Sequence, residues 1–412
     1  MLLTLRLGRF ALKNILRNKV RSGVILGAIA IGLFSGTFLT AFLNGWIVGS
    51  VESDIATQLS HIQIHHTSFL ANCDITATFL RSKVEEQIAL CSDLSSIAIK
   101  TAFRLNLTGM LASPHNSVGI TANAVWEEEE VEVTDIWKFI PDSLGAFLPK
   151  DTRNAIVISQ KIAEKLHVKV RSKVVFSFQD SFGEIQSIAF RVGGIYKTAN
   201  GAFNEGNVFI RYNDVFEATG LPQGAVHVAA LRLPGVEACA IIAPQLQNLL
   251  PNMDVQRWSD LNPSLLFLLG YTDFLAYILL GIFLLALSFG IINTMMMAVL
   301  ERSYELRMLW AIGMTKGKIF GMIMLETLYL TFLGSVVGIF LGFVLLLPTL
   351  KSGIDLSFVI SDQFEDYGFS SIVTPVIDQQ MFVQIAVLVI VAGVLSAIYP
   401  AKKAINGLHI KR

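Results

Sequence analysis

Three closely spaced histidines, His61, His65 and His66, are the residues in this chain whose type and spacing come nearest to a metal site. Because side chains alternate between the two faces of a strand, His61 and His65 are expected on one side and His66 on the other. No carboxylate stands near them in sequence to complete a set of ligands. We therefore predict no metal site.

The stretch GMTKGK (residues 313–318) is the nearest approach to a nucleotide-binding loop. A P-loop reads G-x-x-x-x-G-K-[ST], with a hydroxyl residue after the lysine. Here the spacing between Gly313 and Gly317 is one residue too short, and Ile319 follows the lysine. We predict that the chain binds no cofactor of its own and that energy from ATP must come through another polypeptide.

No Ser/His/Asp, Cys/His or paired-carboxylate arrangement stands out, and no pattern points to nucleic acid, so we predict a non-catalytic protein. Of the cysteines Cys73, Cys91 and Cys239, two could form a disulfide and leave a third thiol, and the residues leave this open. The acidic run Glu127–Glu130 is interpreted as a solvated loop, with contact to a basic partner as the alternative.

Four long apolar runs dominate the chain. The composition is 53% hydrophobic and 16% charged, with a mean hydropathy of +0.58, whereas soluble domains are about 25% charged. About 20 apolar residues suffice to cross the roughly 30 Å hydrocarbon core of a bilayer as a helix. We therefore predict transmembrane helices at residues 22–49, 272–299, 319–347 and 380–400.

Basic residues mark the segments that should remain in the cytoplasm. They are concentrated in the N-terminal segment 1–21, in the loop 300–318 and in the tail 401–412, whereas the loop 348–379 is acidic. This alternation agrees with four spans and predicts a multi-pass membrane protein with both termini in the cytoplasm.

Residues 50–271 have an ordinary soluble composition and are predicted to lie outside the cytoplasm. Alternating runs such as Ser60–His66 indicate strands, and Ser159–Leu166 and Asn213–Thr219 begin with residues that favour helix N-termini. Strands concentrate between about 125 and 233, which suggests a β-rich lobe inserted into an α/β lobe. The predicted fold class is an α-helical membrane protein with four transmembrane helices and a large α+β extracytoplasmic domain between the first and second.

A short charged segment, residues 300–318, joins the second and third predicted spans. On a helix, its apolar residues would share one face, and two of its acids would stand one turn apart, which calls for a cation nearby. The residues concerned are Leu306, Leu309 and Gly313 on the apolar face, and Glu301, Arg302 and Glu305 among the charges. The glycine suits a helix C-terminus. These residues alone leave two interpretations open: a solvated basic loop or a docking helix.

The segment ERSYELRMLWAIG (residues 301–313) resembles the pattern ER-x-x-E-[IL]-x-x-L-x-A-[IL]-G of the FtsX/MacB/LolCE superfamily of ABC transporter permeases. The C-terminal IYPAKKAIN (residues 398–406) is similar to the YPAxxAA ending of that family, and residues 10–32 and 156–178 resemble it as well. Because the chain shows no fused ATPase, it is most similar to the lipoprotein-releasing permeases of the LolC/LolE type.

The resemblance implies a permease subunit of a mechanotransmission-type ABC transporter in the bacterial inner membrane. A separate ABC ATPase dimer would bind ATP and Mg²⁺ and would act on the segment 300–318, which the resemblance identifies as the coupling helix. The implied partners are a second permease subunit, either identical or different, a lipoprotein substrate and a periplasmic chaperone. Two alternatives remain: a MacB-like efflux or export permease, and an FtsX-like transmembrane signalling subunit.

Glycines at four-residue spacing predict close helix packing in two of the spans. Gly334, Gly338 and Gly342 lie on one face of the third span, and Gly32 and Gly36 are similarly placed in the first. At this point it is open whether the partner helix belongs to this chain or to a second permease.

Glu326 is the only carboxylate of the third span. Its position near the cytoplasmic end predicts a pairing with a loop cation, with a proton relay as the alternative. The candidates for contact with membrane lipids or acyl chains are aromatic residues near the outer ends of the first two spans, against the alternative of ordinary lipid-facing aromatics. They are Phe38, Phe42, Trp46, Phe267 and Phe274.

Overall fold

The computed structural model describes residues 19–69, 74–198, 200–355, 372–376 and 379–407. These residues divide into two compact units, which we describe separately. The helical unit takes its residues from 1–48, 269–355 and 372–412, and the α+β unit takes most of its residues from 49–268. Cys73, residues 1–18 of the predicted basic segment and residues 356–371 of the predicted acidic loop lie outside the described residues.

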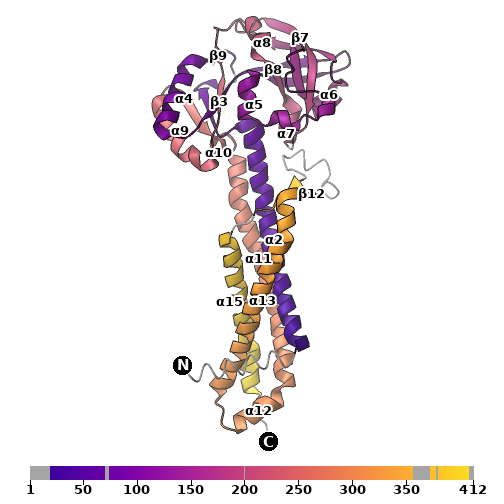
Figure 1. Cartoon of the computed structure of the whole chain (residues 1–412), viewed down its shortest axis with the longest axis vertical. Helices are drawn as coiled ribbons and strands as arrows, with labels where there is room; N and C mark the ends of the chain where they lie inside the picture. Colours follow the sequence, from indigo (N-terminus) through magenta and orange to yellow (C-terminus); the bar gives the residue numbers. More distant parts are fainter. Residues whose placement is uncertain (1–18, 70–73, 199, 356–371, 377–378, 408–412) are drawn as a thin grey trace. The chain divides into compact units, whose positions relative to one another are not determined.

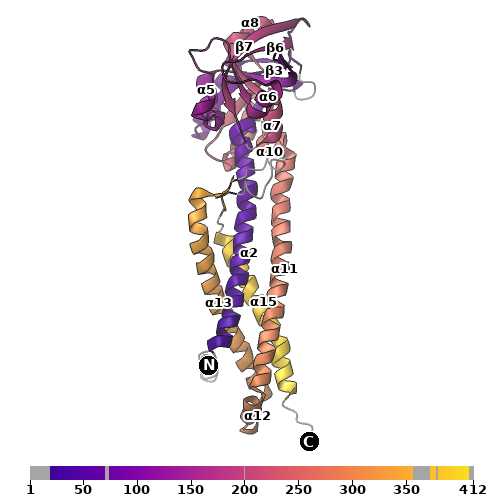
Figure 2. The same cartoon turned by 90° about the vertical axis from the view of Figure 1, so that its right-hand side faces the viewer.

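Four long helices make up most of the helical unit: α2 (Lys19–Asp54), α11 (Pro263–Glu301), α13 (Lys316–Ser352) and α15 (Gln379–Asn406). All four are long and apolar enough to cross a membrane. In both views (Figures 1 and 2) they run alongside one another. A fifth, short helix, α12 (Ser303–Ala311), lies between α11 and α13 in sequence.

The second long helix begins earlier than hydropathy indicated. The span was predicted from residue 272, whereas α11 starts at Pro263. Proline suits the first position of a helix, because its φ is already helical and its missing N–H would have no partner there. Hydropathy indicates which part of a helix could lie within a bilayer, and it does not indicate the residue at which the helix begins.

The glycine face of α13 packs against α2 of the same chain. A Cβ added at Gly334 would lie 2.7 Å from a methyl of Ile29, and one added at Gly338 would lie 3.0 Å from the carbonyl oxygen of Ala30. Gly342 faces Thr37 in the same way. The two glycines of α2 face other helices: Gly32 lies against Leu287 of α11, and Gly36 lies against Leu280 of α11 and Ile385 of α15. We call the contact of α13 with α2 the glycine seam.

The α+β unit is built on one nine-stranded sheet with the order β11-β1-β10-β3-β4-β8-β5-β7-β6. The strands of this sheet are β1 (Ile62–His66), β3 (Lys100–Ala112), β4 (Ser117–Val125), β5 (Ala155–Ser159), β6 (Lys173–Gln179), β7 (Ile185–Tyr196), β8 (Asn207–Arg211), β10 (Val228–Arg232) and β11 (Met253–Arg257). Two further two-stranded sheets pair β2 (Phe79–Leu80) with β9 (Ala225–Val226), and β12 (Ile354–Asp355) with β13 (Ile372–Val373).

Strand β3 lies inside this sheet and also pairs with β6, the strand at one end of it. It pairs antiparallel with β10, with β4 and, through its last residues, with β6. Strands from within the range 125–233, predicted as a β-rich lobe inserted into an α/β lobe, share this sheet with β1 and β11 outside that range. Strand pairing alone does not mark the bounds of the two lobes, which stay a prediction.

Helices and one π-helical turn accompany the sheet. They are η1 (Ile55–Leu59), α4 (Arg81–Ser95), α5 (Glu127–Val133), α6 (Gln160–Leu166), α7 (Gly201–Gly206), α8 (Tyr212–Thr219), α9 (Cys239–Leu249) and α10 (Trp258–Leu261). The predicted cap at Ser159 is present, because its hydroxyl accepts a hydrogen bond from the N–H of Ile162 at 3.1 Å. The predicted cap at Asn213 is wrong: α8 begins one residue earlier, and its N-cap position is Arg211.

The acidic run Glu127–Glu130 is not a solvated loop. It forms the start of α5, and the Glu130 side chain is 0% exposed. Arg104 of β3 donates to both of its carboxylate oxygens, at 3.1 Å and 2.9 Å, and Thr134 donates to one of them. The interpretation failed because the cation that permits this burial comes from a distant strand.

Two of the three clustered histidines, and the described cysteines, are buried in the α+β unit. His61 and His65 are 9% and 2% exposed, and His65 stacks on Phe69. Cys91 and Cys239 are both free thiols. Within the described ranges, no group of three or more His, Cys, Asp or Glu side chains could hold a metal ion.

Candidate functional site

The segment between α11 and α13, residues 301–315, makes two sharp changes of direction, and we call it the connecting segment. Arg302 interrupts the helix with φ −95° and ψ 10°, and α12 starts immediately after it. Gly313 ends this short helix with φ +103°, a conformation that residues with a Cβ rarely adopt. Figure 1 shows α12 at the lower end of the helical unit. Local backbone chemistry therefore fixes both ends of α12.

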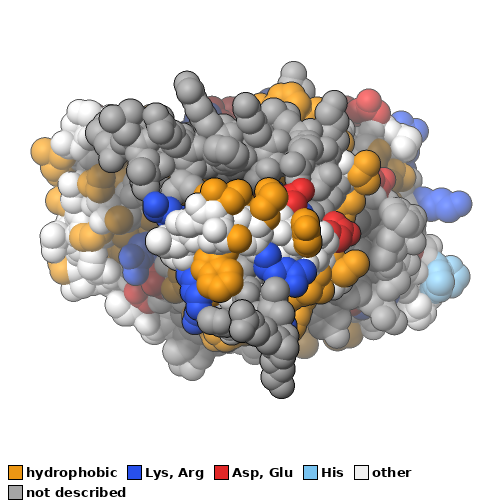
Figure 3. Space-filling model, turned by 90° about the horizontal axis from the view of Figure 1, so that it is seen from below, with side chains coloured by type: hydrophobic (Ala, Val, Ile, Leu, Met, Phe, Trp, Pro, Cys, Tyr) orange, Lys and Arg blue, Asp and Glu red, His pale blue; other side chains and the backbone are white. Residues whose placement is uncertain are grey.

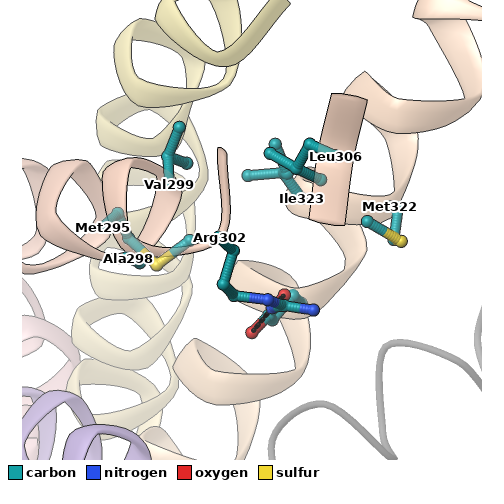
Figure 4. Close-up of a pocket in the computed structure, with 8 residues that line it drawn as sticks. Met295, Ala298, Val299, Arg302, Leu306, Met322 and Ile323 are labelled. Carbon is teal, nitrogen blue, oxygen red and sulfur yellow. Dashed lines mark hydrogen bonds and ion pairs between the residues drawn. The ribbon is translucent and has the colours of Figure 1, made fainter. Parts of the chain in front are cut away.

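Arg302 links three helices through its side chain. Its Nε donates to Glu305 of α12 at 3.1 Å, and its Nη1 donates to Glu326 of α13 at 3.2 Å. The guanidinium and the Glu326 carboxylate are 14% and 12% exposed, whereas the Glu305 carboxylate is 43% exposed. In Figure 4, the Arg302 side chain reaches across to the carboxylate on the neighbouring helix. The residue thus ties the end of α11 to both α12 and α13.

A small cavity of about 10 Å³ lies beside this ion pair. Its lining comes from α11, α12 and α13: Met295, Ala298, Val299, Arg302, Leu306, Met322, Ile323 and Glu326. A space of this size is at the lower limit for a single water molecule. The arrangement is therefore a packed joint and has no room for a ligand.

The apolar residues predicted for one face of α12 point inward. Leu306 is 4% exposed and belongs to the core cluster of the helical unit, and Leu309 packs against that cluster. The charged residue Glu301 is exposed at the end of α11. Of the predicted set, Arg302, Glu305, Leu306 and Leu309 thus come together within the joint, and Gly313 terminates it.

The outward face of α12 is also apolar, which the sequence reasoning missed. Tyr304, Met308 and Ile312 follow one another at four-residue spacing and are 77%, 50% and 76% exposed. Residues at this spacing share one face of a helix. Figure 3 shows this end of the helical unit from below, where apolar side chains lie beside basic ones. We call these three residues the outer stripe. Their four-residue spacing could have revealed them in the sequence. They were missed because α12 was interpreted as an amphipathic helix, which has only one apolar face.

The aromatic candidates for lipid contact are only partly brought together. Phe38, Phe42 and Trp46 follow one another along α2, with ring centroids 6.3 Å and 6.2 Å apart, and each is half-buried. The first two rings are stacked, and the third is tilted by 43°. Phe274 of α11 lies 6.1 Å from Tyr271 and is 59% exposed. Phe267 is 70% exposed and belongs to the α+β unit.

Comparison with known proteins bears on the helical unit. Residues 277–407 match the family model described as FtsX-like permease C-terminal. This part of the chain is similar to an FtsX-like permease domain. This domain includes the whole connecting segment, α13, α15 and the greater part of α11. The match supports an ABC transporter permease, a type that is generally non-catalytic and works with an ATPase as a separate subunit.

No match was found among curated proteins. Among solved structures, the chain is similar to the extracellular domain of the noncanonic ABC-type transporter YknZ from Gram-positive bacteria, at 14% identity and a TM-score of 0.33, covering 48% of this chain and 100% of that one. It is also similar to the periplasmic region of MacB from Actinobacillus actinomycetemcomitans, at 12% identity and a TM-score of 0.34, covering 52% and 97%. Likeness at this level assigns neither a substrate nor a partner to the chain.

Proposed function

We propose that the chain is the permease subunit of a mechanotransmission-type ABC transporter and that α12 receives the motion of an ABC ATPase. The observation that carries the proposal is the two-sided construction of α12. Its inner face is held in the core by Leu306, and its outer stripe is exposed. A short helix that is anchored on one side and apolar on the other suits docking to a second protein, because exposed apolar groups gain most from being covered.

The joint described above would allow α12 to pass a displacement to its neighbours. Arg302 bridges α12 and α13 by ion pairs, and the chain itself connects α12 with α11. A rigid helix transmits a push along its axis, and α11 runs unbroken from Pro263 to Glu301, about 58 Å at the α-helical rise. In this proposal the permease itself does not bind or hydrolyse ATP. The ATPase dimer binds ATP and Mg²⁺.

The proposed substrate is an acylated lipoprotein, extracted from the bacterial inner membrane and transferred to a periplasmic chaperone. The row of aromatic rings on α2 supports this proposal, because Phe38, Phe42 and Trp46 are in contact along one side of the helix and each is partly exposed to an acyl chain. Both termini would lie in the cytoplasm, the α+β unit would lie in the periplasm, and a second permease subunit would complete the transporter.

The first test is a purification of the tagged full-length chain in mild detergent, with bound components identified by mass spectrometry. We expect an ABC ATPase and triacylated lipoproteins to be recovered together. An ATPase recovered with a periplasmic adaptor or a cell-wall hydrolase, and without lipoproteins, would replace lipoprotein release by efflux or by signalling. Failure to recover any ATPase, even after crosslinking, would contradict the docking role of α12.

The second test places a charge in the outer stripe. Met308→Glu and Ile312→Glu should each reduce recovery of the ATPase by about tenfold or more, because a carboxylate would be buried in the proposed contact. Leu94→Glu is the matched control, since Leu94 is 71% exposed on α4 in the other unit. Equal recovery with all three variants would show that the ATPase docks elsewhere.

A further inference from the structure

A cavity of about 290 Å³ lies within the α+β unit, and none of the functions above uses it. Polar side chains make up most of its wall. The lining residues are Thr57, Gln58, Gln63, Arg104, Asn106, Thr121, Asn123, Phe203, Asn207, Phe209 and Val228. Its volume is close to the lower end of the range of about 300–1,000 Å³ that small-molecule sites occupy. It is therefore large enough for a small ligand.

Strand register explains why these side chains meet. Asn106 of β3 pairs with Asn123 of β4, and Asn207 of β8 pairs with Thr121 of β4. Paired residues on neighbouring strands point to the same face of a sheet, and so do residues two apart on one strand. The cavity thus lies on one face of the sheet, where η1 and α7 supply the remaining wall.

Several of the polar groups in the wall are held rigidly. Gln63, Arg104 and Asn123 are 8%, 6% and 7% exposed. The amide nitrogen of Gln63 donates to the carbonyl oxygen of Leu59 at 2.8 Å, and that of Asn123 donates to Asn207 at 3.2 Å. Side chains fixed in this way are already oriented for a ligand, which lowers the entropy lost on binding.

The wall carries no unbalanced charge among the described residues. Arg104 is its one ionic side chain, and Glu130 neutralises it through two hydrogen bonds of 2.9 Å and 3.1 Å. The other polar lining residues are amides and hydroxyls. A charged ligand would therefore lose its hydration without gaining an opposite charge, whereas a neutral ligand would not. This balance selects neutral ligands.

Asn106 presents an acceptor that the protein does not satisfy. Its Oδ1 is buried and has no hydrogen-bond partner within the described part of the chain. Buried polar atoms are rarely left in this state, because the hydrogen bonds to water have been lost without replacement. Because the atom is itself enclosed, a small rotation of the Asn106 side chain is needed before a ligand hydroxyl or N–H in the cavity can supply the missing donor.

We propose that this cavity is a binding site for a small neutral ligand rich in hydroxyl groups, of the size of one or two sugar rings. Amides and hydroxyls provide both donors and acceptors around it, as such a ligand needs. Phe203 and Phe209, which are 3% and 2% exposed and belong to a buried core cluster, close the cavity on its apolar side. This proposal does not depend on ATPase docking, so each can fail alone.

The test uses the full-length protein in a detergent without a sugar headgroup. Binding of glucose, N-acetylglucosamine and maltose is measured by saturation-transfer NMR, with glucuronate and glucosamine as charged comparisons. We expect at least one neutral probe to bind about tenfold more tightly than its charged counterpart. No binding by any neutral probe at millimolar concentration would mean a cavity filled with water only and would overturn the proposal, as would equal binding of charged probes.

Two variants separate a ligand site from a structural amide. Asn106→Leu should weaken binding about tenfold without lowering the unfolding temperature, because it removes an unsatisfied acceptor. Thr121→Val is nearly isosteric and should also weaken binding. It replaces Asn106→Leu as the test if that variant folds poorly. Asn213→Leu, at an exposed position of α8, is the control and should change neither property. Wild-type binding by both cavity variants would overturn the proposal.

Discussion

The two units of the molecule each contain an inward-facing Arg–Glu pair, and the two pairs are enclosed to different degrees. In the α+β unit, the side chains of Arg104 and Glu130 are 7% and 0% exposed. In the helical unit, those of Arg302 and Glu326 are 14% and 12% exposed. The first guanidinium also donates to the carbonyl oxygen of Gln58 at 3.1 Å. The second divides its hydrogen bonds between two acids on different helices.

The difference shows how surroundings decide what an ion pair can do. A fully enclosed pair has no alternative partner, so it fixes the position of β3 against α5. A cation shared between Glu305 and Glu326 can strengthen one contact as it weakens the other, at little net cost. We infer that the first pair holds one arrangement, whereas the second can accommodate small movements of α12.

The largest expected effect is that of Arg104→Met. This substitution leaves Glu130 buried without its cation, which should lower the free energy of unfolding of the α+β unit by about 3–5 kcal/mol. Urea unfolding of the full-length protein, with Trp126 kept and the other four tryptophans replaced by phenylalanine in both wild type and variant, measures the change by fluorescence. Lys150→Met is the control, because its pair with Glu128 is 74% and 86% exposed. A loss no larger than in the control would show that enclosure does not distinguish the pairs.

The next effect is a dependence on pH that involves His65, which lies near Arg104. Burial first, then the charges of Arg104 and His227, lower its pKa from 6.5 to about 4. Between these values the unfolded chain binds more protons, so the stability from neutral His65 is present above pH 6.5 and is lost as pH falls toward 4. Lowering the pH from 7 to 5 should cost about 2 kcal/mol through this residue.

His65→Phe isolates that contribution, because the ring is retained and the titration is removed. The difference between wild type and variant matters, since burial also lowers the pKa of His61 and His227 and raises that of Glu129 and Asp214. The wild type should lose more stability than the variant between pH 7 and pH 5. Parallel pH profiles would contradict the assignment to His65.

A smaller effect is expected for Glu326→Leu. Arg302 retains Glu305 as a partner after this change, so the helical unit should lose about 1–2 kcal/mol, less than the α+β unit loses in Arg104→Met. Thermal unfolding of the full-length protein in detergent provides the comparison. A loss as large as that of Arg104→Met would mean that the two acids are not interchangeable partners of Arg302.

The smallest effect is expected for Glu305→Gln. Its carboxylate is 43% exposed, and exposed ion pairs contribute about 0–1 kcal/mol. The double variant Glu305→Gln, Glu326→Leu should lose more than the sum of the two single variants, because Arg302 then has neither acid. If the losses of unfolding free energy in the two single variants simply add in the double variant, Arg302 is not shared between Glu305 and Glu326.

Local patterns in the sequence predicted those parts of the structure that depend on neighbouring residues. Long apolar runs predicted four helices, and the described part of the chain contains four such helices. Alternation predicted the strand at Ser60–His66, and β1 lies there. Gly313 was expected to end a helix, and its positive φ does so. In each case, hydropathy, periodicity or the backbone freedom of one residue was sufficient.

The contacts that make up the candidate sites could not be predicted in the same way. Glu326 was predicted to pair with a loop cation, and Arg302 is that cation, but the sequence did not identify which one it would be. Arg104 meets Glu130 only because α5 folds back toward β3. The polar cavity requires strands from separate parts of the chain to pair in one register. Such contacts depend on tertiary packing, which cannot be deduced from one sequence. In the sequence, each of these Asn and Arg residues looks like any other polar residue.

The glycine seam has a consequence for the order in which the protein is made. The ribosome completes α2 long before α13, since residues 55–315 are translated in between. At about 5–20 residues per second, the first helix waits on the order of 10–50 s for its partner. During that interval the polar side chains of α2 must find hydrogen-bond partners within the helix. Thr37 and Thr40 donate their hydroxyls to the carbonyl oxygens of Leu33 and Gly36, so they need no partner from another helix. The newly synthesised α2 therefore needs no partner for these hydroxyls before α13 is translated.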